Sequence, residues 1–66
     1  MIRPGDKVKI IRNPKDRKYK ELPEPLGKIG EIVHRSDDGK SFIIRFDDIR
    51  KDLTFGRECI AKIEEA

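Results

Sequence analysis

Apolar and charged residues alternate near the start of the chain. Val8 and Ile10 are flanked by lysines, so one side of an extended segment is apolar and the other is charged. This pattern is typical of a strand with one buried face, and we expect the strand to run from Asp6 to Arg12. The Gly5-Asp6 pair marks a turn at its start. Asn13-Pro14 ends it, because proline cannot donate a hydrogen bond to a neighbouring strand.

Two further apolar stretches predict the second and third strands. In residues 29–35, Ile29 and Ile32 supply the apolar contacts, and Gly30 permits a bend or a bulge. Residues 41–47 alternate cleanly, with both phenylalanines on one face and polar residues on most of the other. We therefore expect two neighbouring strands that share one buried face.

The segment between these two strands, residues 36–40, reads Ser-Asp-Asp-Gly-Lys. An Asp-Gly pair favours a tight two-residue hairpin turn, because glycine adopts the positive φ that such a turn requires. We therefore predict a positive φ at Gly39.

The C-terminal third predicts two more short strands. Residues 53–55 form a fourth strand that ends at Gly56, and residues 57–63 suit a 3₁₀ turn running into a closing fifth strand. The same apolar spacing also fits a short helix over residues 57–65, and this alternative stays open. Five short strands predict an all-β fold, a small barrel or sandwich, made of a single domain over residues 1–66.

The predicted core consists of the apolar residues on the inward faces of these strands. They are Val8, Ile10, Ile29, Ile32, Phe42, Ile44, Phe46, Leu53, Phe55 and Ile63.

Positive charge is concentrated in the first third of the chain. The protein has 16 basic and 13 acidic residues and a net charge of +3, yet eight of the basic residues and only two acidic ones lie in residues 1–20. A long loop before the second strand, together with Arg12 just before it, holds five of these eight basic residues and one aromatic ring. Basic residues interleaved with an aromatic suit RNA, because cations neutralise phosphates and a ring can stack on an unpaired base. The candidate binding residues are Arg12, Lys15, Arg17, Lys18, Tyr19, Lys20 and Lys28.

The N-terminal half resembles the KOW-type modules of ribosomal proteins and transcription elongation factors. The resemblance implies a small five-stranded SH3-like barrel that contacts RNA or a ribonucleoprotein. It rests on Gly5-Asp6, Val8 and Ile10, followed by the segment Gly27-Lys28-Ile29-Gly30-Glu31-Ile32-Val33.

The C-terminal half is similar to another group of small barrels, which belong to the photosynthetic apparatus. These are the E-type ferredoxin-docking barrel of photosystem I, the variable chain of ferredoxin-thioredoxin reductase and the S-type barrel of the photosynthetic NADH dehydrogenase-like complex. The matching segments are residues 36–40, Phe46 and residues 55–63. This resemblance implies a non-catalytic accessory protein that docks an acidic partner such as a ferredoxin-type electron carrier.

Catalytic and metal chemistry find little support in the sequence. His34 and Cys59 are the only residues of their types, and we expect a surface histidine and a buried cysteine rather than a nucleophilic pair. Asp37-Asp38 and Asp47-Asp48 are interpreted as solvated turns rather than as a cation site. We predict no catalytic residue, metal, cofactor or small-molecule substrate.

The remaining features concern the cellular compartment and the origin of the protein. A single cysteine excludes an intrachain disulfide and favours a reducing cytoplasm, and no apolar run is long enough to span a membrane. Charged residues make up 44% of the chain, a composition typical of thermophile proteins and also of designed proteins, so both origins stay open. The thermophile-like composition favours RNA or a ribosomal partner, because the ferredoxin-docking families belong to oxygenic photosynthesis.

Overall fold

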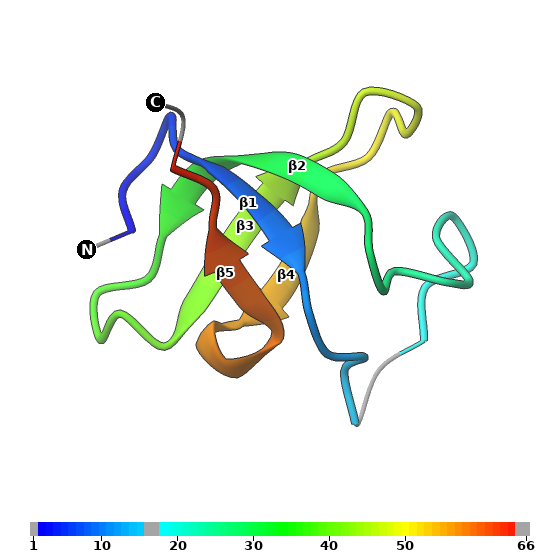
Figure 1. The fold of residues 1–66 in the computed structure, drawn as a ribbon, viewed down its shortest axis with the longest axis horizontal. Coiled ribbons are helices and arrows are strands. Elements are labelled where there is room, and N and C mark those ends of the chain that lie inside the picture. The colour runs from blue at the N-terminus through cyan, green and yellow to red at the C-terminus, as the bar shows by residue number, and fades with distance from the viewer. Residues whose placement is uncertain (1, 16–17, 65–66) are drawn as a thin grey trace.

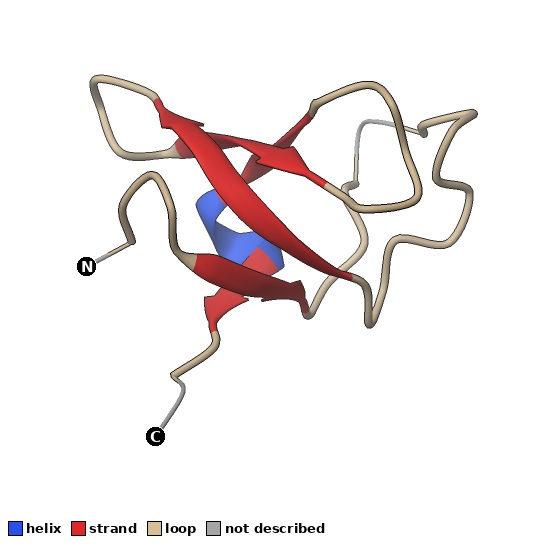
Figure 2. Cartoon of the chain, turned by 90° about the horizontal axis from the view of Figure 1, so that it is seen from above, coloured by secondary structure: helices blue, strands red, loops and turns tan. Residues whose placement is uncertain are grey.

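Five antiparallel strands form one sheet in the computed structural model, which describes residues 2–15 and 18–64. The strands are β1 (Lys7–Ile10), β2 (Ile29–Arg35), β3 (Ser41–Arg45), β4 (Leu53–Gly56) and β5 (Ile60–Lys62) (Figure 1). A 3₁₀ turn, η1 (Arg57–Cys59), joins β4 to β5 and is drawn blue in Figure 2. The all-β class and the 3₁₀ turn before the last strand are confirmed, and the alternative helix over residues 57–65 is wrong.

The strand order is β4-β3-β2-β1-β5. The two edge strands, β4 and β5, are consecutive in the chain and are joined by η1. The sheet curves so that β1 and β5 cross in front of β3 and β4 (Figure 1). The core lies between these two halves of the sheet. The sheet is open, because β4 and β5 are not paired with each other in the described residues. The expected closure into a complete barrel is therefore not observed.

The observed strand ends follow from the pairing partners. The second strand has the predicted bounds, whereas the first ends at Ile10 rather than Arg12 and the third ends at Arg45 rather than Asp47. Strand β1 pairs with β2 as far as Ile29 and with β5 as far as Ile60, where both ladders stop. A strand ends where its ladder partners end.

Eight of the ten predicted core residues are buried, and Ile29 and Ile63 are the exceptions. Ile29 is 54% exposed because it lies directly across from Lys9, on the outer face of the sheet. Ile63 follows the end of β5 and is half-buried. The expected burial of Cys59 is confirmed. The core also contains apolar residues that the sequence patterns missed, namely Ile2, Leu22 and Ile60.

Gly30 lies where β2 passes very close to the end of β3. A Cβ atom at this position would lie 2.5 Å from Cγ2 of Ile44 and 2.9 Å from the carbonyl oxygen of Arg45. Glycine is therefore required here by close packing. The bulge expected at Gly30 is not found there; the register between β2 and β3 shifts by one residue at Val33 instead.

The connection between β2 and β3 is a five-residue loop, and the predicted two-residue turn is wrong. The N–H of Gly39 donates to the carbonyl of Ser36 at 3.0 Å, and the predicted positive φ of Gly39 is confirmed at 71°. The side chain of Asp38 accepts hydrogen bonds from the Ser36 hydroxyl at 2.6 Å and from the Lys40 N–H at 2.9 Å. These two bonds hold the pKa of Asp38 below its ordinary value.

We predict that Gly30→Ala destabilises the fold by about 1–3 kcal/mol, because the new methyl group overpacks against the backbone of β3. Gly56→Ala is the matched control, since the atoms nearest to a Cβ there belong to the carboxylate of Glu58, which is the flexible end of a side chain. Urea denaturation of the two variants measures the difference. Equal losses of stability would contradict the close approach at Gly30.

We also predict that Asp38→Ala lowers the melting temperature more than Asp37→Ala, because only Asp38 accepts hydrogen bonds within the turn. A carboxyl whose pKa is lowered by folding stabilises the fold above its unfolded pKa and loses that effect as the pH falls through its folded pKa. The difference between the two variants should therefore shrink below the ordinary carboxyl pKa of 3.8. A difference that persists unchanged in acid would show that the carboxylate does not hold the turn.

Candidate nucleic-acid interface

The basic residues lie on the long loop that joins β1 to β2, which we call the basic loop (residues 11–28, described except for 16 and 17). In Figure 1 it projects past the ends of these two strands. Its two ends are fastened together, because the N–H of Ile10 donates to the Lys28 carbonyl and the N–H of Gly27 donates to the Ile10 carbonyl, both at 2.8 Å. The loop therefore leaves the sheet and returns to it at one point.

Tyr19 fastens the middle of the basic loop to the sheet. Its ring packs against Phe55, with ring centroids 5.3 Å apart and planes tilted by 45°, and its hydroxyl donates a hydrogen bond to the carbonyl of Thr54. Tyr19 also forms an isolated bridge with Leu22, whose side chain is buried in the core. The one aromatic ring of the predicted site is thus half-buried and held at two points.

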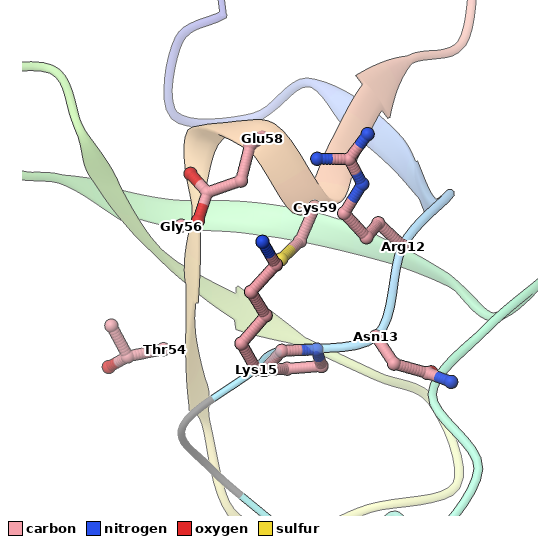
Figure 3. Close-up of a pocket in the computed structure, with 8 residues that line it drawn as sticks. Arg12, Asn13, Lys15, Thr54, Gly56, Glu58 and Cys59 are labelled. Atoms are coloured by element: carbon pink, nitrogen blue, oxygen red, sulfur yellow. The ribbon is translucent and has the colours of Figure 1, made fainter.

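The Thr54 carbonyl belongs to the open edge of β4. The N–H of Arg57 donates to the Lys40 carbonyl. Because bonded and non-bonded residue pairs alternate along an antiparallel ladder, Phe55 bonds to β3, whereas the N–H and carbonyl of Thr54 point away from β3. Tyr19 occupies the outward carbonyl of Thr54. Two residues farther along β4, the carboxylate of Glu58 lies beside Gly56 (Figure 3).

A first hollow, which we call the Cys59 hollow, lies between the start of the basic loop and β4–η1. Its volume is about 270 Å³. It is lined by Arg12, Asn13, Pro14, Lys15, Thr54, Gly56, Glu58 and Cys59. Figure 3 shows the side chain of Lys15 directed into it, toward Cys59, while Asn13 points away from it.

The chemistry of the Cys59 hollow does not favour a nucleophile. Burial and the nearby Glu58 carboxylate raise the pKa of the Cys59 thiol, so it stays protonated at neutral pH. His34 is exposed on β2 and forms no hydrogen bond with Cys59 in the described part of the chain. The sulfur is packed as a core atom, which agrees with the sequence interpretation.

A second hollow, which we call the Tyr19 hollow, is bordered by the middle of the basic loop. Its volume is about 460 Å³, and it shares only Asn13 and Pro14 with the Cys59 hollow, so the two hollows adjoin at this dipeptide. It is lined by Asn13, Pro14, Lys18, Tyr19, Lys20, Pro23 and Pro25. No carboxylate is among these lining residues.

Most of the predicted binding residues gather around these two hollows. Arg12 and Lys15 line the first, and Lys18, Tyr19 and Lys20 line the second. Arg17 lies outside the described residues.

Lys28 stands apart from this group. It lines neither hollow, and its ammonium group lies 3.7 Å from the carboxylate of Asp48.

The sequence interpretation missed the residues that shape the hollows. The prolines that line the Tyr19 hollow carried a usable signal, because proline rings form rigid apolar surfaces, but Pro14 was interpreted only as the end of a strand. Thr54 and Glu58 carried no local signal at all, since they join the site only through the fold.

Other kinds of site find no support in the described residues. No group of three or more metal-ligating side chains occurs in residues 2–15 and 18–64. Within the same residues, no helix is long and apolar enough to cross a membrane.

Comparison with known proteins adds no relative, because no protein-family model, curated protein or solved structure matches the chain.

We predict that unfastening Tyr19 loosens the basic loop. Tyr19→Phe removes the hydrogen bond to Thr54 and should cost about 0.5–2 kcal/mol, and Tyr19→Ala should cost more because the Phe55 contact is also lost. Trypsin cleavage after Lys18 and Lys20 should become faster in the same order, measured under conditions where the sheet stays folded. Unchanged cleavage in Tyr19→Ala would show that the loop is held by other contacts.

Proposed function

We propose that this protein is a non-enzymatic binding module of the SH3-like, KOW-type class, and that its basic loop engages RNA or a ribonucleoprotein such as the ribosome in the cytoplasm. The observation that carries the proposal is the grouping of four exposed cations around two adjoining hollows. These cations are Arg12, Lys15, Lys18 and Lys20. The strand order and the 3₁₀ turn before the last strand support the SH3-like assignment.

The ion pairs of the protein support a binding role for these four cations. Lys28, Arg45 and Lys62 each lie within 4 Å of a carboxylate elsewhere on the surface. By contrast, Arg12, Lys15, Lys18 and Lys20 form no ion pair with any carboxylate in the described residues, although Lys28 at the end of the same loop does. Unpaired cations grouped on one loop are available to phosphate groups, and each phosphate contact releases a bound counterion from the nucleic acid.

The absence of catalysis in this proposal rests on the chemistry of the hollows. The thiol of Cys59 is protonated and buried, and the cations that line the two hollows form no ion pair with a carboxylate of the described residues. Cations without such partners bind anions rather than transform them.

We predict that the triple variant Lys15→Ser, Lys18→Ser, Lys20→Ser binds RNA more weakly and with a flatter salt dependence. Each lost phosphate contact lowers the slope of log affinity against log salt by about 0.7 for a single strand, so three contacts remove about 2. Fluorescence polarisation with a labelled single-stranded RNA, repeated over a range of potassium chloride concentrations, measures both effects.

The matched control is Lys40→Ser, Arg50→Ser, Lys51→Ser. It also removes three positive charges from a protein of net charge +3, but none of its positions lines a hollow. The control should keep most of the salt slope. Equal losses in the two triple variants would show that net charge alone draws RNA to the protein, and no RNA binding at low salt would contradict the proposal itself.

A second candidate function is a protein-docking module for an acidic partner, and one observation favours it. Ile11, Leu26 and Ile29 are each more than half exposed, and all three lie near the base of the basic loop. An acidic protein with an apolar contact surface would match both features. Binding of an acidic protein, lost in Ile29→Ser, together with no RNA affinity at low salt, would favour this candidate.

A further inference from the structure

The walls of the Tyr19 hollow differ in kind from those of the Cys59 hollow. Proline rings and the ring of Tyr19 supply flat apolar surfaces, Asn13 supplies an amide, and Lys18 and Lys20 supply positive charge. The Cys59 hollow instead contains the carboxylate of Glu58, which repels a phosphate. The two hollows therefore suit different contents, although cations border both.

We propose that the Tyr19 hollow binds one unstacked nucleobase of a single-stranded RNA, with Lys18 and Lys20 on the adjacent phosphates. This inference rests on the proposed RNA-binding function and assigns to it a site and a class of ligand. A base has two flat apolar faces and a polar edge. The tyrosine and proline rings match the faces, and the amide of Asn13 can both donate to and accept from the edge.

The hollow is formed before a ligand arrives. Tyr19 is fixed by its contacts with Phe55 and Thr54, and the buried side chain of Leu22 holds the following turn against the core. Pro25 is itself buried. Proline side chains and a fastened ring lose little conformational entropy when a ligand binds, so the contact area contributes more fully to affinity.

The size of the hollow agrees with this content. Its volume of about 460 Å³ lies within the range of about 300–1,000 Å³ that is typical of small-molecule sites. A paired base inside a duplex cannot reach such a hollow without leaving its stack. The site therefore predicts selection of single strands over duplexes, which neutralisation of phosphates alone does not provide.

The composition of the chain gives a direct optical test. Tyr19 is the only tyrosine and the protein has no tryptophan, so the intrinsic fluorescence of the protein reports on the walls of this hollow. The probes are a uridine decamer, an adenosine decamer, a decamer duplex and an abasic decamer of equal charge. We expect both base-bearing single strands to quench Tyr19, and the abasic strand to bind about tenfold more weakly without quenching.

Two variants separate the contacts to the base from the contacts to the phosphates. Asn13→Ala should weaken the base-bearing single strands several-fold and leave the abasic strand unchanged, because only the edge of a base meets the amide. Lys18→Ser with Lys20→Ser should weaken all four probes. Circular dichroism confirms that each variant remains folded before its affinity is compared.

The outcomes distinguish this inference from the function on which it rests. Equal affinity for the base-bearing and abasic strands, with Tyr19 fluorescence unchanged, would overturn the base site and leave RNA binding through phosphates intact. Equal affinity for single strands and duplex would overturn it in the same way. Failure of every probe to bind at low salt would remove the proposed function and the base site together.

Discussion

The contact between Phe55 and Tyr19 joins the two parts of this protein. On one side, the rings of Phe55 and Phe46 form a T-shaped pair, with centroids 5.9 Å apart, inside the core of the sheet. On the other side, it contacts the ring that fastens the basic loop. In a chain of 66 residues the core is small, so each large aromatic ring has to stabilise more than one element. Phe55 makes the position of the loop a property of the core.

This coupling gives the loop its functional character. The basic loop carries more cations than carboxylates, and a loop with an excess of one charge extends into solvent if nothing holds it. Here both of its ends are hydrogen-bonded together and its middle is packed against β4, so its cations are presented around the two hollows. A partner that fits this surface meets an arrangement already in place, and little entropy is lost in ordering it.

The sequence predicted the existence of the strands well, because alternation of apolar and polar residues indicates them. It predicted poorly the features that depend on contacts between residues far apart in the chain. Ile29 shows the limit of pattern reading, because Ile29 and Ile32 are three positions apart and a regular strand directs such residues to opposite faces. The buried face of β2 is the face of Gly30, whose lack of a side chain lets β2 approach β3 closely. An open sheet rather than a closed barrel could not be read from the sequence, because closure depends on pairing between the two strands at the ends of the sheet.

The candidate site divides in the same way. The cations of the basic loop were found as a local excess of charge, which needs no fold to detect. The bond between Tyr19 and Thr54 spans 35 positions and has no counterpart in any local pattern. The sequence interpretation missed the hollows for this reason. It treated Tyr19 as a free aromatic side chain, whereas Tyr19 also packs against Phe55 and bonds to Thr54.

The bond from Tyr19 to the Thr54 carbonyl also bears on how this protein behaves in a crowded solution. A bare strand edge is a template on which another chain can add a strand, and such additions begin aggregation. Along β4 the tyrosine hydroxyl and the Glu58 carboxylate lie where an incoming strand would have to bond. The side chain proposed to contact a ligand therefore also protects the sheet edge. A change that frees Tyr19 would therefore loosen the Tyr19 hollow and, at the same time, uncover the Thr54 carbonyl on the strand edge, where another chain can add a strand.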